Sequence, residues 1–152
     1  MNVKEIFIEQ ITTCYDESGW FVCLKDSLKD LTEEQASLKD GDTNSIWEIA
    51  LHLLFYNERN LKRFTGNNIP AKEGSNAQTF LNKDHLSWDE TVNRLFQNLA
   101  EWRKVVKECS SQQLEEWSPT LSLLFPHNAH HIGQIVHIRK QNGLWNSERG
   151  VH

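Results

Sequence analysis

The segment from His127 to His131 concentrates the side chains with the greatest capacity for chemistry. It reads His-Asn-Ala-His-His, so three imidazoles fall within five residues. If this segment is helical, His127 and His131 lie on one face, about 6 Å apart along the helix axis. That spacing lets two ring nitrogens converge on one metal ion. Solvated or buried histidines that bind no metal share the same spacing, so both interpretations stay open at this point.

A third ligand for such a metal should come from another helix, because metal sites in helical bundles are built from facing helices. His52 and His85 are the candidates. His52 lies in the middle of an expected helix, whereas His85 lies in the loop before Ser87, so His52 is better fixed. The helical angle of His52, however, places it on the polar side of its helix, near Glu48 and Arg59.

Two further side chains are candidates for functional roles. Gln134 lies about one turn beyond His131 on the same face, where its amide could hydrogen-bond a ligand or a water. A packing or capping amide is the alternative for Gln134. Tyr56 lies one turn after His52 and could orient a substrate, although aromatic side chains in helical bundles more often belong to the core.

The other histidines and the cysteines have simpler expected roles. His130 and His137 point away from the line of His127 and are expected at its partly exposed flanks. The three cysteines are widely spaced and form no C-x-x-C motif, which favours reduced thiols that pack as small apolar residues. A cysteine nucleophile paired with histidine is an alternative, and it requires Cys14 or Cys23 to lie near the histidines with a lowered pKa.

Apolar residues recur every three or four positions rather than every two, which predicts an all-α protein. Capping boxes at Ser45–Glu48 and Ser87–Glu90 begin two of the expected helices. The first of these helices ends at Gly66-Asn67-Asn68, and the second ends near Glu108. An N-terminal helix has a weak point at Gly19, and a short capped turn is expected at Thr32–Gln35.

The last helix is expected to open at Ser118-Pro119 and to close at Gly143. Pro126 then either kinks this helix or begins it. About 20 residues, from Asn67 to Leu86, separate the second and third helices. So long a connection should cross the bundle, carry a short element or cover a site. The sequence thus predicts one four-helix bundle over residues 1–152, with this long connection between helices 2 and 3.

Composition narrows the function. The chain has 152 residues, with 16 Lys and Arg against 21 Asp and Glu, and a formal net charge of −5. This length suits a single domain, and the acidic balance argues against a nucleic-acid-binding protein. The chain contains no run of 18 or more apolar residues, so no membrane span is expected. Its first residues lack the features of a signal peptide, which predicts a cytoplasmic location.

Several motifs together resemble the DinB-like superfamily of metal-binding four-helix bundles, which includes thiol transferases of the YfiT-like type. These motifs are Ser45–Leu53, Asn57–Arg59, His127–Ile135 and Arg139–Trp145. The similarity extends over nearly the whole chain. It implies an up-down-down-up bundle, a frequent homodimer, and a divalent metal held by His52, His127 and His131.

The resemblance also implies a function. Zinc is the first expectation for the metal, with nickel, manganese or iron as alternatives. Three neutral imidazoles leave the full charge on the ion and open coordination positions, as in catalytic sites. Such an ion lowers the pKa of a bound water or thiol. We therefore expect a metal-dependent small-molecule enzyme, such as a low-molecular-weight-thiol S-transferase in detoxification or stress response. The alternatives are a metal-dependent hydrolase and a non-catalytic metal-binding or dimerisation module.

Overall fold

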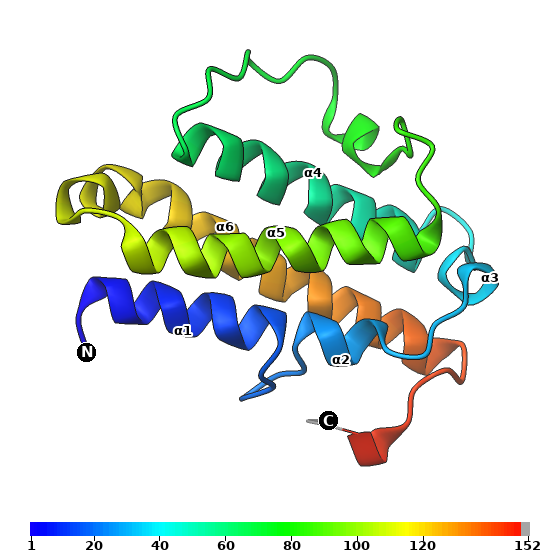
Figure 1. Ribbon diagram of the computed structural model, residues 1–152. Coiled ribbons are helices and arrows are strands. Elements are labelled where there is room, and N and C mark those ends of the chain that lie inside the picture. Colours follow the sequence, from blue (N-terminus) through cyan, green and yellow to red (C-terminus); the bar gives the residue numbers. More distant parts are fainter. Residues whose placement is uncertain (150–152) are drawn as a thin grey trace. The chain divides into compact units, whose positions relative to one another are not determined.

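The computed structural model describes residues 1–149, and all of their regular secondary structure is helical. The predicted all-α class is confirmed. The α-helices are labelled in Figure 1. In chain order the elements are α1 (Val3–Tyr15), α2 (Leu24–Leu28), α3 (Glu33–Ala36), α4 (Ile46–Phe64), the 3-10 helix η1 (Asn76–Phe80), α5 (Trp88–Glu108), α6 (Ser111–Gln141) and the 3-10 helix η2 (Ser147–Arg149).

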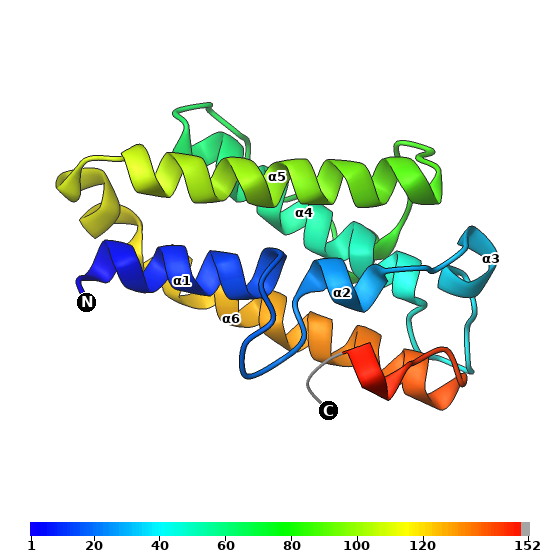
Figure 2. The same ribbon diagram turned by 60° about the horizontal axis from the view of Figure 1, so that its bottom comes forward.

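The chain divides into two compact units. The first comprises Met1–Lys29 together with the chain from Leu99 onward, and the second comprises Asp30–Asn98, so the boundary falls within α5. In the first unit, α1 and α2 both contact α6, and Figure 2 shows them following one another along it. The rings of Phe7 and Trp102 pack edge-on against Phe125. These buried rings form the centre of the first unit's core.

The second unit is organised around α4, which contacts α3 and η1. Trp47 packs edge-on against Trp88, and its indole N–H donates to the Thr91 hydroxyl. The indole N–H of Trp88 donates to the Leu31 carbonyl. Trp88 is buried and Trp47 is partly buried, and the polar edge of each ring keeps a partner, which avoids the cost of an unpaired buried donor.

The predicted capping boxes are present at the expected helix starts. Ser45 and Glu48 exchange side-chain and backbone hydrogen bonds at the start of α4. Ser87 and Glu90 do the same at the start of α5. The capped turn expected at Thr32–Gln35 is the start of α3. In each case two backbone N–H groups without helical partners are satisfied by the motif itself.

The predicted start of the last helix was wrong. Helix α6 begins at Ser111, and Ser110 caps it by accepting from the N–H of Gln113. Ser118 lies inside the helix, where its hydroxyl donates to the Leu114 carbonyl instead of capping a new N-terminus. The helix also continues through both prolines, so Pro126 does not begin it.

The N-terminal helix is interrupted around the predicted weak point. Helix α1 ends at Tyr15, and α2 begins at Leu24. The Ser18 hydroxyl accepts from the N–H of Cys23 and donates to Asp26. At the break between the two helices, this side chain thus replaces hydrogen bonds that a continuous helix would make. The apolar periodicity continues on both sides of the break, although the helix does not.

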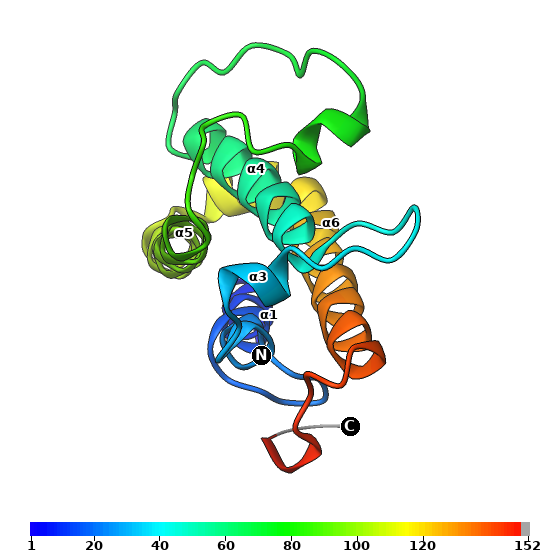
Figure 3. The same cartoon turned by 90° about the vertical axis from the view of Figure 1, so that its right-hand side faces the viewer.

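The connection between α4 and α5 carries a short element, which is one of the three alternatives expected for it. That element is η1, and Figure 3 shows the connection arching over α4 with η1 beside the helix. Its first residues include Gly66, whose φ of 91° is accessible to glycine at little cost. Within residues 1–149, no helix is long and apolar enough to cross a membrane.

Candidate metal centre

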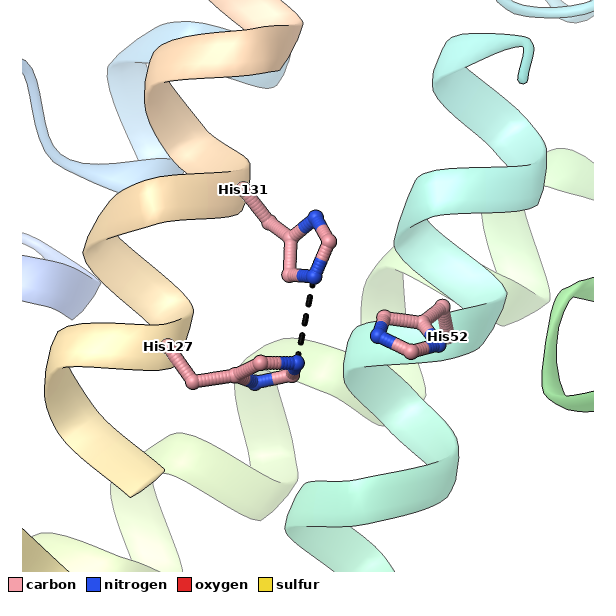
Figure 4. A group of neighbouring side chains, drawn as sticks. All are labelled: His52, His127 and His131. Atoms are coloured by element: carbon pink, nitrogen blue, oxygen red, sulfur yellow. Dashed lines mark hydrogen bonds between the residues drawn. The ribbon is translucent and has the colours of Figure 1, made fainter. Parts of the chain in front are cut away.

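Helix α6 presents His127 and His131 as a contacting pair. Their Nε2 atoms lie 3.1 Å apart, and Figure 4 draws this contact as a dashed line. Two imidazole nitrogens bound to one tetrahedral zinc ion, at about 2.0–2.1 Å each, are separated by about 3.4 Å. The pair therefore already has nearly the spacing that a shared metal ion requires.

Both rings of this pair favour the neutral state. Burial, followed by the neighbouring charges of His131 and His130, lowers the pKa of His127 to about 4. Burial also lowers the pKa of His131, against the opposing effect of its hydrogen bond to Gln134. A neutral imidazole carries the lone pair that a metal ligand needs, so the environment selects the binding form.

Gln134 determines which nitrogen of His131 carries the proton. The Gln134 Oε1 atom lies 2.6 Å from His131 Nδ1. An amide oxygen only accepts, so Nδ1 donates and Nε2 carries the lone pair. A hydrogen bond of this kind fixes both the tautomer and the orientation of a metal-binding histidine. The same-face placement expected for Gln134 therefore holds, and its amide oxygen binds the histidine ring.

In the second unit, His52 is held in the same tautomer by a different acceptor. The Thr79 hydroxyl lies 2.6 Å from His52 Nδ1 and donates its own proton to the Asn76 carbonyl. Because that hydroxyl proton is already used, the oxygen accepts from Nδ1–H of His52, and Nε2 again carries the lone pair. The ring also stacks on Phe80, with centroids 4.0 Å apart.

The expectation that His52 lies on a polar side of its helix was wrong. Its side chain is only 2% exposed. The physical reason is η1, whose Thr79 and Phe80 cover this side of α4. Helical angle alone did not reveal this, because the covering residues are 27 and 28 positions away in the sequence. No motif in the sequence marks Thr79 or Phe80 as partners of His52.

Tyr56 takes part in the same arrangement. Its hydroxyl donates to Asn76 Oδ1 at 2.7 Å, and its ring packs edge-on against His52. Asn76 thus receives one hydrogen bond on its side chain from Tyr56 and another on its carbonyl from Thr79. Tyr56 therefore helps to fasten η1 to α4 above the histidine ring.

The remaining candidate histidines lie outside this arrangement. His85 is exposed in the loop before α5, with a φ of 52°, and so lacks the fixed position of a helical ligand. His130 and His137 are exposed on α6, as expected for flanking residues. His130 does contact the ring of His131, with centroids 5.0 Å apart.

The cysteine-nucleophile alternative is contradicted. Cys14 is buried, and its Sγ donates to the Phe125 carbonyl. Burial raises the pKa of Cys14 to about 12, and burial also raises the pKa of Cys23. A nucleophilic thiol needs the opposite shift, because the thiolate is the reactive form. Both cysteines are free thiols inside the core, as the packing interpretation predicts.

Comparisons with known proteins give a family and no individual relative. No curated protein and no solved structure matches the chain. The model of the DinB superfamily matches residues 24–135, which is more than half of the chain. The matched region includes the histidine pair of α6, Gln134 and the single histidine of α4. The chain therefore belongs to the DinB superfamily.

Proposed function

We propose that His52, His127 and His131 together hold one divalent metal ion, zinc in the first place, with nickel, manganese or iron as alternatives. Each of the three residues can offer one ring nitrogen to the same ion. The hydrogen bonds that His131 and His52 make on their other ring nitrogen support this proposal. Gln134 and Thr79 each occupy the Nδ1 atom of a ligand, so the Nε2 lone pair is the one presented.

Such an ion, bound by three neutral imidazoles, would keep its 2+ charge and would lower the pKa of a water or thiol bound at an open position. The chain's own residues hold the three rings in place. Gln134 prevents His131 from rotating, and the Thr79 hydroxyl and the Phe80 ring do the same for His52. A ligand set fixed before the ion arrives costs less to order on binding.

We infer that the reaction is the transfer of a low-molecular-weight thiol to a small electrophile, in detoxification or stress response. In this reaction the thiol sulfur bonds to the electrophilic carbon, the leaving group departs with its bonding electrons, and the thiol proton passes to solvent. The donor set of three neutral histidines supports this function, because it suits activation of a nucleophile better than a closed structural site does. The cysteines support it indirectly, since burial raises the pKa of both Cys14 and Cys23 and so disfavours either thiol as the nucleophile.

The single observation that carries the proposal is the 3.1 Å contact between the Nε2 atoms of His127 and His131. Calorimetric titration with Zn²⁺ tests it. We expect one ion per chain in the unaltered protein and no stoichiometric binding after His131→Ala or His52→Ala. His137→Ala is the matched control, because it removes an exposed histidine from the same helix. Equal loss in the control, or no stoichiometric ion in the unaltered protein, would contradict the site.

A second assay separates an enzyme from a non-catalytic binding module. The zinc-loaded protein would be mixed with monobromobimane and either bacillithiol, glutathione or coenzyme A, and the fluorescent conjugate would be followed. We expect turnover with one of these thiols and its loss in His131→Ala. Hydrolysis of ester or amide substrates without thiol transfer would favour the hydrolase alternative. A metal-loaded protein without either activity would favour the module.

The proposal extends to the assembly of the chain. We propose that α1, α4, α5 and α6 are the helices of the up-down-down-up bundle of this superfamily, and that two copies pair in the cytoplasm as a homodimer. An experimental structure tests the arrangement of the helices. Sedimentation velocity tests the oligomeric state, and a mass equal to one chain at micromolar concentration would contradict the dimer.

A further inference from the structure

The second unit contains a cavity that is separate from the metal-binding nitrogens. It is a cavity of about 320 Å³ between α4, the α4–α5 connection and the first half of α5. This volume is in the range of about 300–1,000 Å³ typical of small-molecule sites. Its apolar lining includes Leu51, Leu54, Phe55, Ile69, Leu81 and Leu86. We refer to it as the α4 cavity.

The charged residues of the α4 cavity are not balanced. Glu58 and Asp84 are its acidic lining residues, and both are bound by Arg94. Arg94 makes three contacts of 2.8–3.0 Å to the Glu58 carboxylate, so that acid is already neutralised. The other charged lining residues are the cations Arg59, Lys62 and Lys83.

These three cations have no acidic partner within the part of the chain that the structure describes. Arg59 donates to the Pro70 carbonyl, and Lys83 lies 3.4 Å from the Gln78 side-chain oxygen, so both of these partners are neutral. Arg59 and Lys62 are three positions apart on α4 and share a face. A chain with a net charge of −5 thus keeps a local excess of positive charge beside an apolar cavity.

One apolar wall of the cavity is exposed to water. Leu81 is 56% exposed, whereas Leu51 and Leu54 form a buried floor. An apolar ligand body that covers Leu81 would gain the free energy of removing that surface from water. The combination of an apolar floor, an exposed apolar wall and unbalanced cations matches a ligand with an apolar body and one anionic end.

We propose that the α4 cavity binds a small organic carboxylate with an apolar body, its anionic end at Arg59, Lys62 and Lys83. This inference does not depend on the proposed metal site or on the reaction. Within the second unit the cavity nevertheless lies next to His52, because Thr79 lines the cavity and also accepts from His52. An occupant of the cavity would therefore contact the residue that orients a histidine.

Fluorescence titration with 8-anilinonaphthalene-1-sulfonate, an apolar molecule with one anionic group, tests the proposal on the full chain without metal. Decanoate should displace the probe, whereas decanol, decylamine and inorganic phosphate at equal concentration should not. Displacement by decanol as strong as by decanoate would overturn the anionic half of the proposal. Displacement by phosphate would overturn the apolar half.

Two variants locate the binding. Lys62→Glu replaces attraction by repulsion and should weaken decanoate binding about tenfold. Leu81→Ser removes an exposed apolar wall and should weaken it about fivefold. Lys25→Glu makes the same charge change at an exposed lysine of α2 and should leave binding unchanged. Lys62 and Leu81 are both exposed, so these two variants should still fold, and a thermal melt checks this. Unchanged affinity in both variants, or equal weakening in Lys25→Glu, would overturn the site.

Discussion

Gln134 shows how one exposed side chain can control a proposed metal ligand. Its amide oxygen holds the Nδ1 proton of His131 and so presents Nε2. Gln134→Leu should therefore weaken zinc binding by roughly 10–100-fold, as loss of an orienting partner typically does. Gln134→Glu keeps an acceptor and should bind close to normally. Calorimetric titration measures both, with Gln112→Leu, near the start of the same helix, as the control. An unchanged affinity in Gln134→Leu would show that the ring is held by other contacts.

The thiol of Cys14 should be almost inert in the folded protein. With a pKa of about 12, the fraction present as thiolate at pH 8 is about 10⁻⁴, far below that of an ordinary cysteine. A variant with Cys23→Ala and Cys109→Ala isolates this thiol. Its reaction with Ellman's reagent at pH 8 should be roughly a thousandfold slower in the native state than in denaturant. A fast native reaction would restore a cysteine as a candidate nucleophile.

The residues of the proposed site differ in how far the sequence could reveal them. His127, His131 and Gln134 follow from helical spacing, because their mutual contacts are local to α6. His52 was identified as a better-fixed ligand candidate than His85 from its position in a helix. Its burial and its bond to Thr79 could not be predicted, because they depend on where a 3-10 helix in a long connection packs. Tertiary contacts of this kind leave no periodic signal.

At the scale of elements, the helix boundaries that local sequence signals determine could also be predicted. Starts marked by a reciprocal capping box were located correctly, because two hydrogen bonds within four residues make the start of α4 and of α5 favourable in any context. The pair Ser118-Pro119 offers a capping hydroxyl, but no Glu or Gln follows three residues later to complete the box. Ser118 instead bonds back to Leu114 in the helix interior, and α6 begins eight residues earlier, with Ser110 as its N-cap.

Arg139 connects the end of α2 to the C-terminal segment. The residue is 5% exposed, and its guanidinium donates to the carbonyls of Ser27, Lys29 and Leu144 and packs against the ring of Trp145. These carbonyls would lose their charged donor in Arg139→Ala. The free energy of unfolding, measured by urea titration, should therefore fall by about 3 kcal/mol.

The control for Arg139→Ala is Arg103→Ala. Arg103 makes a two-point ion pair with Asp16, but both side chains are partly exposed. We therefore expect Arg103→Ala to lower the free energy of unfolding by about 1 kcal/mol. Arg139→Lys should recover little stability, because a single ammonium does not reproduce the guanidinium's planar fork of donors. An Arg139→Ala variant as stable as Arg103→Ala would show that the C-terminal segment is held mainly by apolar packing.

At the scale of the whole molecule, net charge bears on whether this chain can bind DNA. A protein that binds DNA without sequence preference gains affinity from each phosphate that it neutralises. This chain carries a net charge of −5, and three of its cations, Arg59, Lys62 and Lys83, line the α4 cavity. Such a surface should attract one small anion and repel a polyanion.

We therefore expect no binding to DNA under conditions that favour it. Labelled duplex and single-stranded DNA would be titrated at low salt and followed by fluorescence anisotropy. Non-specific binders reach dissociation constants of about 10⁻⁴–10⁻⁶ M even at physiological salt, so the absence of saturation up to about 100 μM protein would be decisive. A thermal melt of the same preparation serves as the control that the protein is folded. Micromolar binding that weakens steeply with added salt would instead reveal a basic surface that the net charge conceals.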